Sequence, residues 1–192
     1  AAVWVSVPGV AVWAGALSAE GCGARWSAAG GVALVAGSPC TLRAPPVSGW
    51  CVAAFGALTP AREKAMAAIT AGEHLLLASP TGSGKTLAGF LVLLSELTRL
   101  AHEGQLEERP YVVYVSPLKA LVNDVAKNLQ RPLDGIASTC GSMGLPDPRI
   151  RVAIRTGDTM PGERAKQLRK PPHIMVTTPE SLALLLASEG WR

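Results

Sequence analysis

The strongest fold signal in the chain is the octapeptide Ser79-Pro80-Thr81-Gly82-Ser83-Gly84-Lys85-Thr86. A short apolar run, residues 74–78, precedes it, and an apolar pattern at helical spacing over residues 87–94 follows. A glycine-rich turn between a strand and a helix lets backbone N–H groups converge on a phosphate without obstruction by Cβ atoms. The positive end of the following helix adds to the attraction. The octapeptide therefore predicts a phosphate-binding loop (P-loop) in an α/β nucleotide-binding domain.

Each part of this loop has an expected role in binding ATP with Mg²⁺. Lys85 reaches the β- and γ-phosphates as a point charge, the Thr86 hydroxyl ligates Mg²⁺, and the residues before them form the cradle. The general pattern is G-x-x-x-x-G-K-[ST], and Ser79 stands where that pattern has its first Gly. We expect Lys85 and Thr86 to carry the catalytic contribution of this segment, and the whole loop to bind the cofactor.

Strand-like and helix-like segments alternate along the chain from residue 59 onward. Thr59-Pro60 predicts the start of a helix that ends at Gly72, since a hydroxyl N-cap followed by proline is a common helix start. Apolar runs predict strands at 74–78, 111–115, 151–155 and 174–177. Helices are expected at 85–101, from 116, at 161–168 and from 178, whereas the prolines and glycines of 131–148 suggest a loop around a short helix. This alternation predicts a parallel sheet with helices on both faces.

Three polar turns directly follow predicted strands. Ser116-Pro117 and Thr178-Pro179 each predict a capped helix start, and Thr156-Gly157 predicts a tight turn. The carboxyl ends of parallel strands meet at one edge of a sheet, where ligands bind. Hydroxyls, free N–H groups and the nearby Lys119 would suit a sugar–phosphate backbone. The alternative is that these residues are only good helix caps.

From Trp50 to Arg192 the chain resembles the first motor domain of superfamily 2 DEAD/DEAH-box helicases, and is most similar to the large helicase-related (Lhr-type) subgroup. The similarity lies in five stretches: residues 55–60, the P-loop, 116–124, 155–159 and 177–182. The last of these, Thr177-Thr178-Pro179-Glu180-Ser181-Leu182, is the most distinctive. The resemblance implies a RecA-like fold and ATP-dependent translocation on, or unwinding of, a DNA or RNA strand. It implies that Ser116, Pro117, Lys119, Thr156, Gly157, Thr178 and Pro179 contact that strand.

Two departures from the family pattern bear on activity. Arg62 stands at the position where the family has an adenine-binding Gln, and Arg only donates hydrogen bonds whereas Gln also accepts them. The acidic motif II and a second motor domain, with its arginine finger, are expected beyond residue 192. We therefore read the chain as truncated, and expect residues 50–192 to bind nucleotide with negligible turnover. Another type of P-loop NTPase, or a nucleic-acid-binding module without hydrolysis, are the alternatives.

Composition divides the chain at about residue 50. Hydrophobic residues make up 48% and charged residues 17% of the 192 residues, which supports a packed core. Residues 1–49 hold few charges and no persistent periodicity, and predict a low-complexity flank that is poorly ordered or non-native. Part of another domain, or a membrane or export segment, are the alternatives for the flank; its prolines and glycines and its lack of a basic start argue against a membrane segment.

Charge and cysteine content limit the partners and the compartment. The net charge of +4 suits an anionic partner only weakly. The four cysteines form no C-x-x-C pair, which argues against a zinc site or a disulfide framework and favours a reducing compartment, the cytoplasm.

Overall fold

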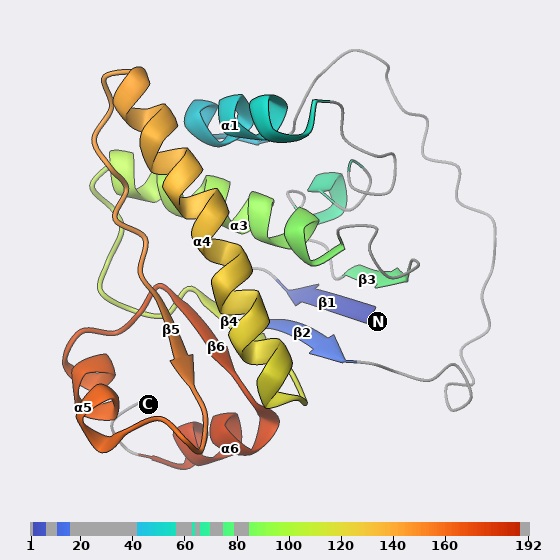
Figure 1. Cartoon of the computed structure of the whole chain (residues 1–192), viewed down its shortest axis with the longest axis vertical. Coiled ribbons are helices and arrows are strands. Elements are labelled where there is room, and N and C mark those ends of the chain that lie inside the picture. The colour runs from blue at the N-terminus through green and yellow to red at the C-terminus, as the bar shows by residue number, and fades with distance from the viewer. Residues whose placement is uncertain are drawn as a thin grey trace.

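The computed structural model describes residues 2–6, 11–15, 42–56, 63, 66–69, 75–78 and 85–188 (Figure 1). Side chains are described for residues 42–56, 63, 66–69 and 86–188. The P-loop residues Ser79–Gly84, the adenine-side Arg62 and most of the flank therefore lie outside the described residues.

A six-stranded sheet in the order β3-β1-β2-β4-β6-β5 forms the middle of the fold. The strands β2, β4, β6 and β5 are parallel to one another. Strand β1 lies between β3 and β2 and is antiparallel to both, so β3 runs in the same direction as β2 and β4. The strands are β1 (Ala2–Ser6), β2 (Ala11–Gly15), β3 (Leu75–Ala78), β4 (Val112–Val115), β5 (Val152–Arg155) and β6 (Ile174–Thr177). The four strands predicted from apolar runs are confirmed.

The helices follow the strands as the alternation predicts. They are α1 (Pro45–Phe55), α3 (Lys85–His102), α4 (Lys119–Ser142), α5 (Pro161–Arg169) and α6 (Pro179–Ala187). The chain goes outward from β4 to β5 and returns to β6, so with right-handed connections α4 and α5 cover opposite faces of the sheet. The predicted α/β, RecA-like architecture is confirmed. Residues 66–69, within the helix predicted from Thr59-Pro60 to Gly72, are also helical, and Met66 and Ile69 are buried.

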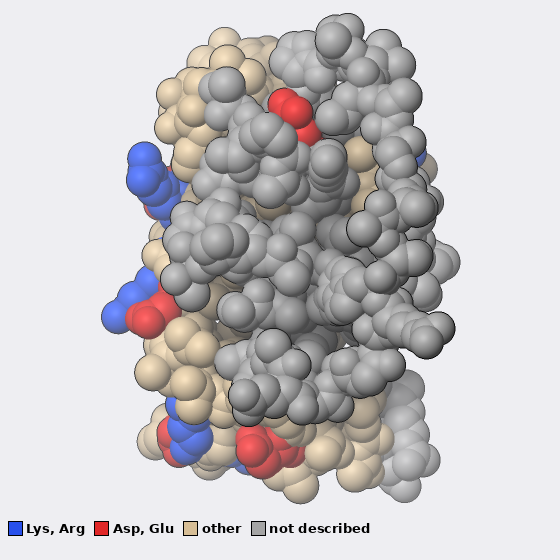
Figure 2. Space-filling view, turned by 90° about the vertical axis from the view of Figure 1, so that its right-hand side faces the viewer, with Lys and Arg blue, Asp and Glu red and all other residues tan. Residues whose placement is uncertain are grey.

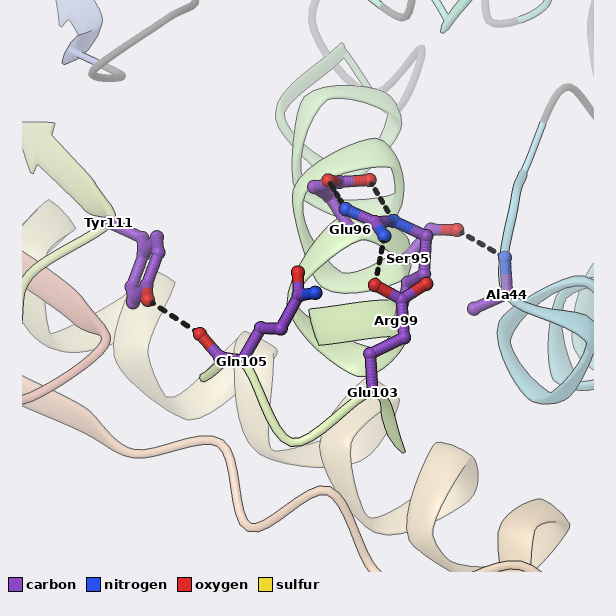
Figure 3. A network of polar contacts seen from close by, with 7 residues as sticks. All are labelled: Ala44, Ser95, Glu96, Arg99, Glu103, Gln105 and Tyr111. Carbon is purple, nitrogen blue, oxygen red and sulfur yellow. Dashed lines mark hydrogen bonds and ion pairs between the residues drawn. The ribbon is translucent and has the colours of Figure 1, made fainter. Parts of the chain in front are cut away.

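The predicted boundary between residues 49 and 50 falls inside helix α1. Pro45 and Pro46 occupy its first turn, where a missing N–H costs nothing. Val47 and Cys51 are buried, and the backbone N–H of Ala44 donates to Ser95 Oγ on α3 at 2.9 Å (Figure 3). The flank also supplies β1 and β2, although its sequence shows no strand periodicity, and the antiparallel β1 makes the sheet mixed. Pairing partners elsewhere in the chain therefore decide the structure of these segments.

Helix α4 corrects two predictions. It begins at Lys119 with Leu118 as N-cap, so Ser116 does not cap it, and it continues through Pro132 to Ser142 where a loop around a short helix was expected. Pro132 is buried in the core, as are Val122, Leu129 and Ile136 on the same side of the helix. The apolar packing of this side outweighs the hydrogen bond that a proline removes.

The core lies between the sheet and the layer formed by α1, α3 and α4. Helix α1 contacts both α3 and α4, and α4 contacts β5 and β6. The ring of Phe90 on α3 lies 5.4 Å from that of Tyr114 on β4, which fixes α3 over the middle of the sheet. Within the described part of the chain, no helix combines the length and apolarity that a membrane span requires.

Candidate nucleotide and nucleic-acid interface

The three polar turns that follow β4, β5 and β6 meet at one edge of the sheet. Val115 and Arg155, the last residues of β4 and β5, both pair with Thr177, the last residue of β6. The backbone N–H of Ser116 donates to the Thr177 carbonyl at 2.9 Å. The arrow of β5 in Figure 1 points to this edge, where α6 and the first turn of α4 also lie. We call this edge, with Ser116–Lys119, Thr156–Thr159 and Thr178–Ser181, the rim.

An arginine holds the turn at the end of β5. Arg164 on α5 donates from Nε to the Thr159 carbonyl at 2.7 Å and from Nη2 to the Gly157 carbonyl at 2.8 Å. The backbone N–H of Thr156 donates to Thr159 Oγ1 at 2.9 Å. These contacts close the turn from within, and leave Gly157 and Asp158 exposed on its outer side.

The hydroxyl side chains predicted to face a nucleic acid are buried. Ser116, Thr156 and Thr178 are 1%, 8% and 3% exposed. Ser116 Oγ has no hydrogen-bond partner among the described residues, and Thr178 Oγ1 donates to Ser181 Oγ at 3.2 Å. The solvent-facing part of the rim includes the other four predicted residues, Pro117, Lys119, Gly157 and Pro179, and also Leu118, Asp158 and Glu180.

The start of α6 agrees with prediction in position but not in detail. Thr178 is the N-cap and Pro179 the first helical residue, yet the Thr178 side chain makes no capping hydrogen bond. The first intrahelical bond runs from the N–H of Leu182 to the Thr178 carbonyl at 2.9 Å. The N–H groups of Glu180 and Ser181 therefore lack an intrahelical acceptor and can serve an anion.

Lys119 is paired with an acidic residue of the next turn. Its Nζ donates to both carboxylate oxygens of Asp158, at 2.9 and 2.8 Å. The two side chains are 58% and 72% exposed. The predicted positive charge is thus present at the rim, but a carboxylate that comes from a turn 39 residues further along the chain partly neutralises it.

The first turn of α3 lies at the same edge of the sheet. Burial raises the pKa of Tyr114 near the end of β4, and a hydrogen bond with the Thr86 side chain acts in the opposite direction. Helix α3 begins at Lys85, as predicted, so the positive end of its helix dipole lies at this edge of the sheet. The start of α3 and the three polar turns are therefore on one side of the sheet, as a joint nucleotide and nucleic-acid site requires.

The Thr86 hydroxyl fits a role as a Mg²⁺ ligand. A hydroxyl can donate to Tyr114 and still offer a lone pair to a cation, and Thr86 is only partly buried. The described residues contain no cluster of three or more His, Cys, Asp or Glu that could hold a metal ion.

Two residues that shape the rim were not among the predicted site residues. Arg164 orders the turn after β5, and Asp158 pairs with Lys119. Asp158 stands in the Arg155-Thr156-Gly157-Asp158-Thr159 stretch, so its place in a turn was visible, but its partner was not. Arg164 carries no local signal, because its three acceptors are backbone carbonyls.

A family model described as "DEAD/DEAH box helicase" matches residues 59–191. The chain is 51% identical over 143 residues to the ATP-dependent helicase Lhr-Core protein 2 of Thermococcus barophilus, a match that covers 74% of this chain and 17% of that relative. It is 48% identical over 139 residues to the Lhr helicase/probable uracil glycosylase of Mycolicibacterium smegmatis, which covers 72% of this chain and 9% of that relative. This chain thus spans less than a fifth of either relative.

Solved structures show the same similarity in three dimensions. The helicase Lhr of Mycobacterium smegmatis bound to ssDNA and AMP-PNP matches with a TM-score of 0.70 and 44% identity, over 77% of this chain and 18% of that one. The DUF1998 helicase MrfA bound to DNA and AMPPNP matches with a TM-score of 0.58 and 25% identity, over 77% of this chain and 19% of that one.

Proposed function

The chain belongs to the DEAD/DEAH box helicase family, and on this basis we propose that it is part of an ATP-dependent nucleic-acid helicase or translocase of the Lhr type. It contributes the P-loop side of the ATP site and part of the track for a DNA or RNA strand. The observation that carries this proposal is the alignment of the ends of β4, β5 and β6 with the start of α3 along one edge of the sheet.

The rim suits a backbone contact that does not depend on base sequence. Its exposed residues include Lys119 and Gly157, next to the acidic Asp158 and Glu180, and the N–H groups at the start of α6 lack an intrahelical acceptor. The Lys119 charge and these backbone groups can bind phosphate, a contact that positions a strand and carries no sequence information. The relative of known structure that was solved with ssDNA and AMP-PNP supports both ligands.

The nucleotide-binding residues keep the roles predicted from the sequence, whereas three of the predicted strand contacts change. Lys85 and Ser79–Gly84 bind the triphosphate, and Thr86 ligates Mg²⁺. Lys119, Gly157 and Pro179, together with Pro117, line the strand, while Ser116, Thr156 and Thr178 act from beneath by shaping the turns. Arg62 would contact the adenine. We place the protein in the cytoplasm, because its cysteine spacing favours a reducing compartment.

Binding by the 192-residue chain tests the proposal. We expect it to bind a fluorescent ATP analogue with Mg²⁺, and to bind single-stranded oligonucleotides. Lys85→Ala should weaken nucleotide binding by about 1.5–3 kcal/mol, since it removes a charge-assisted contact, and should leave strand binding without nucleotide unchanged. Equal nucleotide affinities for the wild type and Lys85→Ala would reject the assignment of the ATP site. Strand binding without any nucleotide binding would favour a module that has lost hydrolysis.

A further inference from the structure

The ion pair between Lys119 and Asp158 has a consequence for how the rim binds a strand. We propose that Asp158 competes with nucleic-acid phosphate for Lys119, so that this carboxylate weakens the contact of Lys119 with the strand. This inference rests on the proposed function of the rim, and assigns to Asp158 a part in setting the affinity for the strand.

The geometry shows that Lys119 is occupied when no strand is bound. Its Nζ lies 2.9 Å from Oδ1 and 2.8 Å from Oδ2 of Asp158, so both carboxylate oxygens face the ammonium group. A phosphate presents the same kind of anionic oxygen at the same hydrogen-bond length. The ammonium group has three N–H donors but a single charge, so the two anions compete for that charge, and binding of one weakens binding of the other.

The exposure of the pair makes the exchange feasible. The side chains of Lys119 and Asp158 are 58% and 72% exposed, so a phosphate can approach the ammonium group from solvent. Exposed pairs of this kind are weak. On the described part of the face in Figure 2, lysine and arginine residues lie along one margin next to acidic residues.

Asp158 is not needed to shape its own turn. The turn is closed by the contacts of Arg164 with the carbonyls of Gly157 and Thr159, and by the bond from Thr156 N–H to Thr159 Oγ1. None of these uses the Asp158 side chain. Since the turn has its own supports, the carboxylate can leave Lys119 without loss of the local structure.

Competition of this kind suits a protein that must release a strand repeatedly. When the strand leaves, Asp158 restores a partner to Lys119, which lowers the cost of dissociation. A carboxylate at the rim also repels phosphate directly, and this general effect must be separated from competition for Lys119. The same rim supplies a control, because Glu180 is an exposed acidic residue in the first turn of α6 that forms no ion pair with any described residue.

The test is a double-mutant cycle in the 192-residue chain, with binding of a labelled single-stranded oligothymidylate measured by fluorescence anisotropy over a salt series. Asp158→Asn should tighten binding about 2–5-fold at low salt, and should steepen the slope of log affinity against log salt by up to about 0.7. Lys119→Ala should weaken binding by a similar factor. With Lys119→Ala already present, the gain from Asp158→Asn should fall to that of Glu180→Gln, which should be equal in both backgrounds.

The outcomes separate this inference from the proposed function. If Lys119→Ala weakens binding but Asp158→Asn leaves it unchanged, or tightens it equally in both backgrounds, the competition is refuted while the strand-binding rim stands. If the chain binds no strand, or if Lys119→Ala has no effect, the rim itself is wrongly assigned. A fall in melting temperature for both single variants would show that the Lys119–Asp158 pair serves only to hold the start of α4 against the turn after β5.

Discussion

Helix α4 connects two regions of the molecule with opposite character. At its amino end, at the rim, Leu118, Lys119 and Leu121 are exposed, and the charged Lys119 pairs with Asp158, which is exposed as well. At its other end Ile136 and Cys140 are fully buried. This difference shows that packing away from the rim stabilises the domain, which leaves the rim free to carry solvent-exposed charges for a ligand.

The buried end of α4 depends on a close approach to helix α1. A Cβ atom added at Gly135 would lie 1.9 Å from Nε1 of Trp50. The indole packs edge-on against Phe55, with ring centroids 5.5 Å apart. Gly135 therefore leaves the space on α4 that the Trp50 indole ring fills.

The two edges of the sheet repeat this contrast. At the amino edge, the carbonyl of His173 accepts the N–H groups of Tyr111 and Val112 at 2.9 and 3.0 Å, and its Nδ1 accepts the N–H of Arg151 at 3.1 Å. A buried histidine thus ties together the segments that begin β4, β5 and β6. The hydrogen bonds of His173 at the amino edge are therefore all within the protein, whereas at the rim several polar groups remain available.

The largest effect is expected from a substitution that disturbs packing at the buried end of α4. Gly135→Ala should destabilise the protein by about 2 kcal/mol, because the methyl group would overlap the Trp50 indole, and overpacking outweighs the better helix propensity of Ala. Gly141→Ala is the matched control on the same helix, since a Cβ there meets no atom within 4 Å, and it should stabilise by about 0.5 kcal/mol. Urea unfolding would measure both. Equal stabilities of the two variants would show that the space at Gly135 for Trp50 does not matter for stability.

The next effect concerns the amino edge. Burial, helped by the charge of Arg151, lowers the pKa of His173 from 6.5 to about 4. The unfolded chain binds a proton below pH 6.5 while the folded protein does not, so the stability contributed by neutral His173 is complete above pH 6.5 and is lost as the pH falls towards 4. His173→Asn keeps an acceptor for the Arg151 N–H but does not titrate, and should flatten the dependence of unfolding free energy on pH in this window. Parallel profiles for wild type and variant would rule out His173 as the responsible group.

A smaller effect is expected from loosening the rim. Arg164→Ala should cost about 1 kcal/mol of stability, since its hydrogen bonds to the turn after β5 are partly exposed to water. Binding of a single strand should weaken several-fold because the turn is no longer held in its binding conformation. Arg169→Ala removes the same charge from an exposed position of α5, and so controls for charge alone. Strand affinities that fall equally for both variants would indicate a general charge effect.

The smallest effect on stability is expected at the exposed end of α4. Lys119→Ala should change the unfolding free energy by less than about 0.5 kcal/mol, because exposed ion pairs contribute little. Strand affinity should nevertheless fall about 2–5-fold. Lys127→Ala, also exposed on α4 but two turns further from the rim, should leave both quantities nearly unchanged. A large loss of stability in Lys119→Ala would contradict the division of α4 into a structural and a ligand-facing end.

Local sequence determined the elements whose signals are short-range. The strands β3 to β6 are read from apolar runs, and the starts of α3, α5 and α6 from a P-loop lysine and from prolines at the first helical position. The order of these elements also predicts the α/β class and the edge at which the polar turns gather. Each signal lies within a few residues of the element that it predicts, which is why it is visible without a structure.

Tertiary structure alone decided the features that depend on a distant partner. Pro132 and Gly135 read as helix breakers, yet both lie within α4 because α1 and the core pack against them. Lys119 reads as a free charge, and only folding brings Asp158 to it. The burial of Ser116 is equally invisible in the sequence. Propensity acts between neighbours in the chain, whereas packing and ion pairing act between neighbours in space, and at these positions the second outweighs the first.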